Sequence, residues 1–562
     1  MFGESLLLKG VRVVDFAHDG HKSEGSVGAN ELVDVHIEHG RVRAVQPKLP
    51  DPGCPSIDAD GRWLIPGLWD AHVHADLWST TPMRLALNPS DSLEETLSTI
   101  AERRATLPPG EDIIEAAGFR PSAWPQEPTV AQLDQVTGDI PTIVISGDVH
   151  SGWLNTAALG MFNLASRKGI FRENEWFALL SRMETHPALQ GRHTQGHVRM
   201  AQDAAAKGVV GVVDMSFSAT PEDWPKRYAA GVDQLRVRFA TYPHGLEERI
   251  SMGLRTRDAL PGSPLNARYS RKGAQGSRAE GKGALVPYSS GAALFTQGPL
   301  KIIVDGSLGT RTAWCRHAYP GTSARISEGG PQGALALGAA SPSEDPGAHA
   351  FGVSNIDTAD LRDLVAHAAS NGITVALHAI GDQALDQVIG VLEDTAASGS
   401  IEHLQMATDA DIERIAVLGR VNASVQPAHL LDDRDLAASA WPGREDLCFR
   451  YASLARAGVE LKLGSDAPVS PLDPWLAMAA AVFRSADERE AWNPSEALTP
   501  AQALAASVDG QGVVAPGSRG DVVLLDANPL ADQGSPRANA QWLRGMPVAL
   551  TVMAGGVTHV AL

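Results

Sequence analysis

Short apolar runs recur along the middle of the chain and alternate with longer stretches that have helical character. Eight of these runs have the length and composition of buried strands: 68–73, 209–214, 235–241, 299–304, 374–378, 400–402, 421–425 and 460–464. Strands that alternate with helices indicate βα units and a parallel sheet. Eight such units close a (β/α)8 barrel, so the pattern predicts an α/β fold with a TIM-type barrel over residues 67–510.

One interval of the predicted barrel is too long for a single βα connection. It runs over about residues 78–205 and contains a further apolar run at 141–146. We therefore expect an inserted subdomain over the barrel mouth. A second segment, 261–298, is rich in Gly, Ser, Lys and Arg and favours a surface loop, with a lid over the site as the alternative.

Both ends of the chain show short strands and turns rather than βα units. Residues 1–66 include "EHGR", whose glycine is typical of a tight hairpin, and residues 511–562 carry strand-like runs of the same kind. Neither end alone is large enough to bury a core. We expect the two ends to pair into one small composite β-sandwich domain.

Composition and charge narrow the function classes. The 562 residues are 43% hydrophobic and 20% charged, as in globular proteins, and the net charge of −19 argues against a nucleic-acid partner. The N-terminus has no signal-peptide pattern, no apolar run reaches about 18 residues, and three scattered cysteines suit a reduced compartment. We expect a cytoplasmic protein that acts on a small molecule and not at a membrane, and a homodimer remains open.

The first predicted barrel strand ends in two histidines. In "WDAHVH" the alternation of an extended strand puts Asp70, His72 and His74 on one face. Neutral imidazole is the commonest metal ligand in proteins, so the pair suits a metal ion. The alternative is two hydrogen-bonded histidines at the end of a strand.

Other predicted strands carry residues of the same chemistry, and in a (β/α)8 enzyme the chemistry lies at the C-terminal ends of the strands. These residues are Lys301, His378, His403 and Asp466. A lone histidine at a strand end is more often part of the core. Four imidazoles and a carboxylate on one rim instead indicate a divalent metal, Zn, Mn, Fe or Co, because no thiolate is among the donors.

The motifs "PGLWDAHVH", "KIIVDGSLGTRTA", "LHAIGDQALD", "IEHLQ" and "GSDAPVSPLDP" resemble, in this order, those of the amidohydrolase superfamily. The chain is most similar to the amidohydrolase-3 branch, which includes N-substituted formamide deformylases, and the resemblance runs from about residue 5 to residue 560. It implies a barrel with a composite β-sandwich and one or two metal ions, most simply Zn.

The same resemblance implies a role for each ligand. His72, His74 and Asp466 would bind one ion, His378 and His403 a second, and a CO2-carboxylated Lys301 would bridge the two. Lys301 lies early in its predicted strand, whereas Asp305 follows the end of that strand. The alternative is therefore a buried Lys301 paired with an acid, together with a one-metal site.

A further stretch, "SGDVHSGWLNTAAL" at 146–159, resembles the "DGHSxWxNSxAL" pattern of that branch, with Val149 breaking the usual Asp-Gly-His order. The resemblance implies that His150 and Trp153 contact the substrate. The alternative is a capping loop within the insert.

These features together predict a hydrolase that cleaves a C–N amide-type bond, in an N-acyl or N-formyl amine or a cyclic amide, with metal-activated water. Asp466 would act as general base and then general acid. Asp70 would either orient a ligand imidazole or serve the core. A deaminase or esterase-type hydrolase on the same site is the first alternative. A non-catalytic binding protein is the remote one, because such a chain would have lost ligands.

Overall fold

The computed structural model describes residues 5–16, 31–88, 91–108, 110–121, 124–217, 220–264, 293–321 and 350–562. Most of the predicted loop at 261–298 lies outside this part of the chain. None of the helices within the described ranges is both long enough and apolar enough to cross a lipid bilayer.

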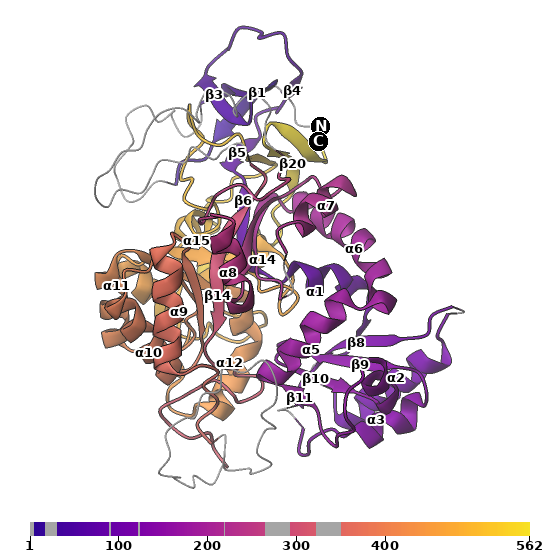
Figure 1. Cartoon of the computed structure of the whole chain (residues 1–562). Helices are drawn as coiled ribbons and strands as arrows, with labels where there is room; N and C mark the ends of the chain where they lie inside the picture. Colours follow the sequence, from indigo (N-terminus) through magenta and orange to yellow (C-terminus); the bar gives the residue numbers. More distant parts are fainter. Residues whose placement is uncertain are drawn as a thin grey trace.

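Eight parallel strands form a nearly closed barrel at the centre of the molecule (Figure 1). The strands follow one another around the barrel in the order in which they occur along the chain. They are β6 (Leu68–Val73), β12 (Val209–Asp214), β13 (Arg236–Thr241), β14 (Phe295–Ile303), β15 (Val375–Ala379), β16 (Gly399–His403), β17 (Val421–Val425) and β18 (Leu461–Leu463). Each of the eight predicted strands matches one of them, and the predicted (β/α)8 fold class is confirmed.

The barrel closes where the segment after β18 meets β6. The Asp466 amide donates to the His72 carbonyl at 2.7 Å, and the His74 amide donates to the Ala467 carbonyl at 2.9 Å. Gly464 is required at this seam, because a Cβ there would lie 2.8 Å from the His72 amide nitrogen. Closure therefore places the ends of the first and last strands side by side.

Strand β14 begins four residues earlier than the sequence pattern predicts. Its register against β13 shifts between Phe239 and Thr241, opposite the Gly298–Pro299 pair. A bulge at this point lets the strand continue past a proline that cannot donate to the ladder. Because β14 begins at Phe295, Lys301 does not lie near the start of the strand. It lies two residues before the C-terminal end at Ile303.

Helices between the strands cover the barrel from outside (Figure 1). In α10 (Asp382–Asp394) the buried Leu385, Val388, Ile389 and Leu392 recur at helical spacing and pack into the main core. The other helices of this layer are α7 (Asp223–Ala229), α8 (Pro243–Ser251), α9 (Thr358–Ser370), α11 (Asp409–Leu418), α12 (Leu430–Ala440), α13 (Tyr451–Arg456), α14 (Pro474–Phe483), α15 (Pro500–Ala505) and α16 (Pro536–Arg544). Short 3-10 turns are η3 (Pro427–His429), η4 (Glu445–Leu447) and η5 (Pro494–Glu496).

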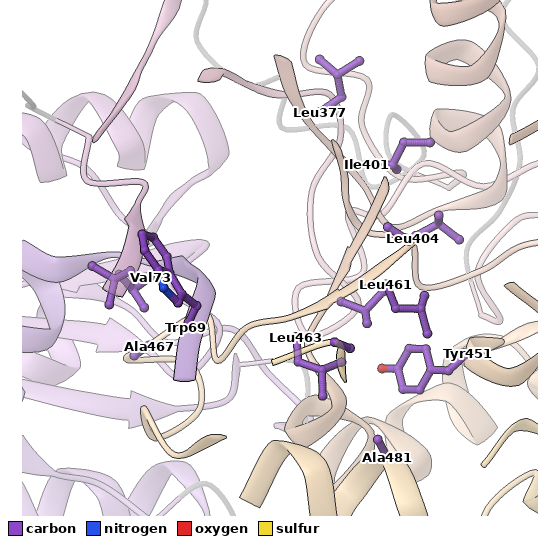
Figure 2. Close-up of a cluster of buried hydrophobic side chains, with 14 of the residues drawn as sticks. Trp69, Val73, Leu377, Ile401, Leu404, Tyr451, Leu461, Leu463, Ala467 and Ala481 are labelled. Atoms are coloured by element: carbon purple, nitrogen blue, oxygen red, sulfur yellow. The ribbon is translucent and has the colours of Figure 1, made fainter. Parts of the chain in front are cut away.

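The main core is continuous between the strands and these helices. Figure 2 shows part of it, where Leu461 and Leu463 of β18 lie near Tyr451 of α13 and Ala481 of α14. This packing fixes the strand ends that carry the polar residues.

The interval between β6 and β12 folds around a second sheet, with strand order β11-β10-β9-β8-β7. The spare apolar run at 141–146 is β9 (Thr142–Ser146), and its partners are β7 (Leu85–Ala86), β8 (Ile114–Phe119), β10 (Ser151–Leu154) and β11 (Phe171–Arg172). The helices of the interval are α1 (Ala75–Thr80), η1 (Thr81–Met83), α2 (Leu93–Ala105), α3 (Val130–Thr137), α4 (Thr156–Met161), α5 (Glu173–Thr185) and α6 (Pro187–Ala206). We call this part the insert.

The two ends of the chain build a third sheet together. Its strands are β1 (Ser5–Val13), β2 (Val33–Glu38), β3 (Arg41–Gln46), β4 (Ser56–Asp58), β5 (Trp63–Pro66), β19 (Val522–Leu525), β20 (Val548–Met553) and β21 (Gly556–Val560). The antiparallel pair β5–β19 joins the two ends. His39 and Gly40 have φ of 52° and 74°, the conformation of the tight hairpin that "EHGR" predicts.

The terminal sheet lies at the end of the barrel where the strands begin, and the insert lies near the other end (Figure 1). Buried ion pairs connect the strand starts to the terminal segments: the Arg236 Nε lies 2.7 Å from Asp521, and the Arg238 Nη1 lies 2.7 Å from Asp509. The C-terminal ends of the strands are therefore left for the insert to cover.

Candidate metal centre

Three of the predicted ligands meet at the C-terminal rim of the barrel. Ligand atoms of His72, His403 and Asp466 all lie within 4.8 Å of one another, and all three residues are buried. The Asp466 Oδ1 is 3.5 Å from the His72 Nε2 and 3.3 Å from the His74 Nε2. The alternation of side chains along β6 brings both His72 and His74 to the Asp466 carboxylate.

The backbone at two of these strand ends is strained. His403 and Asp466 have φ of 68° and 56°, in the left-handed region that residues other than glycine rarely adopt. Such conformations cost free energy and are held by the surrounding structure at functional sites. Here they occur at two residues of the cluster.

His378 and Lys301 complete the set. The His378 ring lies 4.4 Å from the His403 ring, centroid to centroid, and its Nε2 donates to the Gly306 carbonyl at 3.2 Å. A neutral imidazole that donates through Nε2 keeps Nδ1 as an acceptor. The Lys301 Nζ is 3.3 Å from the His72 Nε2, and no carboxylate of the described residues lies within 4.0 Å of it. A Lys–acid pair, the alternative for Lys301, is therefore not seen in the described residues.

Burial sets the protonation of these groups. It lowers the pKa of His72 and holds the pKa of His378 and His403 well below its ordinary value, so their imidazoles are neutral at pH 7. Burial also lowers the pKa of Lys301. For Asp466 burial acts to raise the pKa, but the neighbouring imidazoles outweigh it and hold the pKa well below its ordinary value. Neutral imidazoles beside a carboxylate are the form in which metal ligands bind.

The sequence analysis missed a buried carboxylate next to this cluster. The Glu402 Oε2 accepts a hydrogen bond from the His72 Nδ1 at 2.6 Å, and both side chains are at most 1% exposed. This contact fixes the His72 tautomer and leaves Nε2 free for a ligand bond. The available signal was an acidic residue inside a buried parallel strand, directly before His403.

Asp70 has a different role from Glu402. Its carboxylate accepts from the His72 amide at 3.0 Å and from the Ser465 amide at 2.9 Å. Burial raises the pKa of Asp70 to about 7. Asp70 therefore ties the barrel seam together and does not orient an imidazole, which supports the second of its two predicted roles.

The donor set fits a divalent cation. It combines neutral imidazole nitrogens with a carboxylate and has no thiolate, a combination that suits Zn, Mn, Fe or Co. The buried His403 Nδ1 has no hydrogen-bond partner among the described residues. A cation among these side chains would provide a partner for a buried polar atom that otherwise costs free energy.

A cavity opens from the cluster toward the insert. It encloses about 690 Å³ of space, part of it open to solvent, and its lining includes His378, His403 and Asp466. The rest of the wall comes from the insert and from the loops after β14 to β18, and its polar side chains include Arg120, Gln405, His429 and Asp433. The cluster is therefore accessible to a small molecule.

His150 reaches this cavity from the insert. Its ring lies 5.5 Å from the His378 ring, and its Nδ1 is 2.9 Å from the Glu173 carboxylate. Burial acts to lower the pKa of His150, but Glu173 outweighs it and raises the pKa to about 9. His150 is thus an imidazolium at neutral pH.

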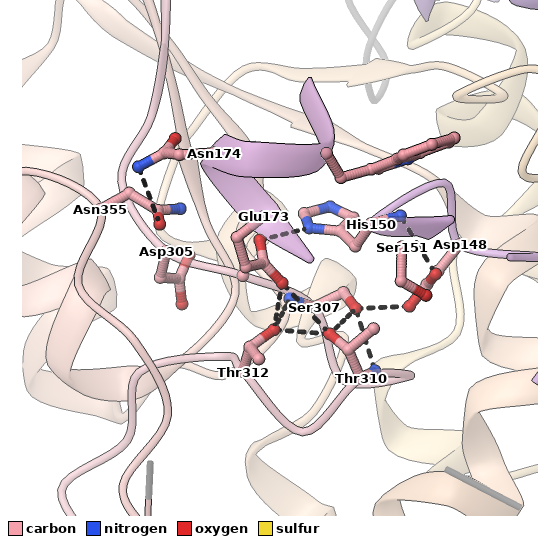
Figure 3. Close-up of polar contacts among 12 residues, drawn as sticks. Asp148, His150, Ser151, Glu173, Asn174, Asp305, Ser307, Thr310, Thr312 and Asn355 are labelled. Atoms are coloured by element: carbon pink, nitrogen blue, oxygen red, sulfur yellow. Dashed lines mark hydrogen bonds and ion pairs between the residues drawn. The ribbon is translucent and has the colours of Figure 1, made fainter. Parts of the chain in front are cut away.

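The contacts of Glu173 and Asp148 bind this part of the insert to the barrel (Figure 3). Thr312 donates to Glu173 at 2.6 Å, and Ser307 donates to Asp148 at 2.5 Å. Ser307 and Thr312 belong to the loop after β14, which also carries Asp305. Asp305 accepts from the Ile380 and Gly381 amides and so joins two rim loops, and its Oδ1 also lies 3.4 Å from the His378 Nε2.

The structure does not bring Trp153 to the cavity. This side chain is fully buried in the core of the insert, where its Nε1 donates to the Thr129 carbonyl at 2.9 Å. It packs beside Phe119 and Trp124. Its place is that of a packing residue, whereas His150, three positions earlier, lines the cavity.

Comparisons with known proteins agree with this geometry. The family model described as "Amidohydrolase family" matches residues 56–559. The N-substituted formamide deformylase of Arthrobacter pascens is 24% identical over 525 residues, which covers 85% of this chain and 86% of that protein. Protein LONG AFTER FAR-RED 3 of Arabidopsis thaliana is 24% identical over 522 residues, 85% of this chain and 80% of that protein.

A solved structure shares the fold over nearly the whole chain. It is an uncharacterized metal-dependent hydrolase from Pyrococcus horikoshii, with a TM-score of 0.66, 22% sequence identity and coverage of 94% of this chain and 99% of that chain. The order of the motifs, the ligand geometry at the rim and the family match lead to one conclusion. The chain belongs to the amidohydrolase family.

Proposed function

We propose that this protein is a metal-dependent hydrolase that cleaves a C–N amide-type bond in an N-acyl or N-formyl amine or a cyclic amide. The observation that carries the proposal is the cluster of His72, His403 and Asp466. Its ligand atoms lie within 4.8 Å of one another, and it opens into the cavity. The similarity to an N-substituted formamide deformylase supports this choice of bond.

His72, His74, His378, His403 and Asp466 would hold one or two ions, with Lys301 between the two sets. A divalent cation bound there supplies Lewis acidity and lowers the pKa of bound water from about 15.7 toward about 7. In the two-ion form the neutral Lys301 amine combines with CO2, losing a proton, and presents a carbamate. The lack of a carboxylate partner for its Nζ among the described residues supports this form.

Asp466 is the residue suited to move the proton. Its low pKa keeps it ionised and able to accept a proton from the attacking water, which it then passes to the leaving nitrogen. One of its oxygens faces the His72 and His74 imidazoles, while the other lies 3.9 Å from the His429 Nε2. A single carboxylate would thus serve first as base and then as acid.

His150 is placed to act on the carbonyl oxygen of the substrate. Its Nδ1 is bonded to Glu173, so its protonated Nε2 remains as a donor on a residue that lines the cavity. A cationic donor at this position would stabilise the negative charge that develops on the oxygen during attack.

Product analysis tests the proposal. The zinc-loaded protein is incubated with a panel of N-formyl and N-acyl amines, and the released carboxylate, amine and ammonia are measured. We expect equal amounts of carboxylate and amine, and a loss of at least about 10³-fold in kcat per bound metal ion for Asp466→Asn. Ammonia released from amino-substituted heterocycles with no amide turnover would instead assign a deaminase. Full activity of the Asp466→Asn variant would overturn the role of that residue.

A further inference from the structure

The cavity has an inner part that differs in size and chemistry from the outer part. The inner part encloses about 330 Å³ and is bounded by His72, His74, Lys301 and the other ligands, so a bound cation and its water would fill some of this space. Its remaining wall combines the polar side chains of Asp148 and His150 with the apolar Val149, Phe177, Phe217, Ile303 and Val469. The outer part is about twice as large, shares Asp148 and His150 with the inner part, and adds the polar side chains of Arg120, Gln405, His429 and Asp433.

The two parts suit different halves of an amide. The outer part, with Arg120, His429 and Asp433 in its wall, has room and polar partners for the amine half. Besides the ligands, Asp148 and His150, the inner part offers the apolar side chains of its wall, which suit the hydrocarbon of a short acyl group. This assignment rests on the proposed function.

Val149 closes the inner part with a strained backbone. Its φ is 64°, in the left-handed region where a β-branched residue is a clear outlier. Its amide donates to the Ser146 carbonyl at 3.0 Å, and its carbonyl accepts from the Trp176 Nε1 at 2.8 Å, so the conformation is fixed on both sides. Glycine would adopt this conformation without strain.

The aromatic side chains on the same wall are packed against each other and leave little freedom. Phe177 stacks on Phe217 at 5.2 Å, and Phe217 stacks on His74 at 5.0 Å. Val149, by contrast, belongs to a short turn between β9 and β10 of the insert. Shortening its side chain is therefore the smallest substitution that enlarges the inner part of the cavity.

We propose that Val149 sets the upper length of the acyl group, and that the substrates are amines that carry a short acyl group of one or two carbons. The side chain occupies the space that a longer acyl chain would need beside the metal ligands. The strained backbone is then retained because it places an isopropyl group at this point of the cavity.

The test compares Val149→Gly and Val149→Ala with the wild type, all zinc-loaded. The substrates are the formyl, acetyl, propionyl and butyryl derivatives of one amine. We expect the ratio of kcat/KM for propionyl over formyl to rise about tenfold or more in both variants, since one methylene in a fitted pocket is worth at least that factor. Val144→Ala, a buried valine in the core of the insert that does not line the cavity, serves as the matched control and should leave the ratio unchanged.

A binding series separates this inference from the proposed function. Aceto-, propiono- and butyrohydroxamic acids bind metal centres without being hydrolysed, and their affinities for the zinc-loaded proteins are measured by calorimetry. We expect the wild-type affinity to fall with chain length and the fall to be relieved in both Val149 variants. If the wild type hydrolyses no amide, the proposed function fails while the hydroxamate series still decides the role of Val149.

The two variants also distinguish size from strain. Val149→Gly removes both the side chain and the backbone strain, and we expect its melting temperature to rise because the strain is lost. Val149→Ala keeps the positive φ and only enlarges the cavity. Equal chain-length dependence in the wild type and in folded Val149→Gly and Val149→Ala would overturn the inference. It would also be overturned if the wild type bound butyrohydroxamic acid as tightly as acetohydroxamic acid.

Discussion

Substitution of Glu402 by glutamine should weaken metal binding without moving any ligand. The carboxylate accepts from the His72 Nδ1 at 2.6 Å in a fully buried site, and the Ser400 hydroxyl also donates to it. A cation at the His72 Nε2 draws electron density from the ring and strengthens the bond from Nδ1 to an anionic acceptor. Glutamine keeps an acceptor oxygen at the same place but removes the charge.

The magnitude follows from the kind of bond. Hydrogen bonds to charged groups contribute about 1.5–3 kcal/mol and neutral ones about 0.5–1.5 kcal/mol. The change from carboxylate to amide should therefore cost about 1–2 kcal/mol of binding free energy, which is about 5- to 30-fold in the dissociation constant. Glu402→Ala also leaves the His72 Nδ1 without a buried partner and should cost more.

Competition with a chelator of known zinc affinity measures the dissociation constant of each variant. The matched control is Glu496→Gln, which neutralises a buried glutamate that accepts from Ser453 and does not line the cavity. We expect the control to lose stability and keep the wild-type zinc affinity. An affinity of Glu402→Gln within twofold of the wild type would refute the reasoning.

Three further predictions concern stability and modification. The Glu173 carboxylate raises the pKa of His150 to about 9, above the ordinary 6.5, so this pair should stabilise the fold fully below about pH 6.5 and lose its contribution as the pH rises through 9. Denaturant unfolding should therefore give a lower free energy of unfolding at pH 9.5 than at pH 7, and Glu173→Gln should abolish this difference. A Glu173→Gln variant with the same pH dependence as the wild type would contradict the prediction. Asp509→Ala removes the carboxylate that pairs with the buried Arg238 and with the partly exposed Arg519, which keeps Asp521 at 3.7 Å. It should lower the free energy of unfolding by about 3–5 kcal/mol, measured by urea denaturation, at wild-type zinc affinity. For Lys301, intact mass under gentle conditions with bicarbonate should show one added CO2 that is absent from Lys301→Ala; an unmodified lysine beside two bound ions would exclude the carbamate.

The barrel and its ligands were accessible to sequence reasoning because two simple patterns determine them. Parallel strands buried on both faces appear as apolar runs, and the polar residues that end those runs necessarily meet at one rim. This is enough to bring His72, His403 and Asp466 together from positions up to hundreds of residues apart. The start of β14 was predicted too late because Gly298 and Pro299 are typical strand breakers, and only the bulge against β13 makes them compatible with the ladder.

Glu402 could not be assigned from strand alternation. In a regular strand Glu402 and His403 point to opposite faces, yet both approach the His72 imidazole, because His403 has a φ of 68°. Trp153 shows the converse limit. Its motif resembles one of a known family, but which of its side chains faces the cavity depends on the packing of the whole insert, which no local pattern contains.

The metal content of the purified protein tests the central claim most directly. Plasma mass spectrometry after growth with added zinc, followed by gel filtration, gives the number of ions per chain. The account predicts one to two equivalents in the wild type and a loss of at least one equivalent in His72→Ala and in His403→Ala, with the fold retained by circular dichroism. A wild type that binds no metal, or variants that keep the full complement, would contradict it.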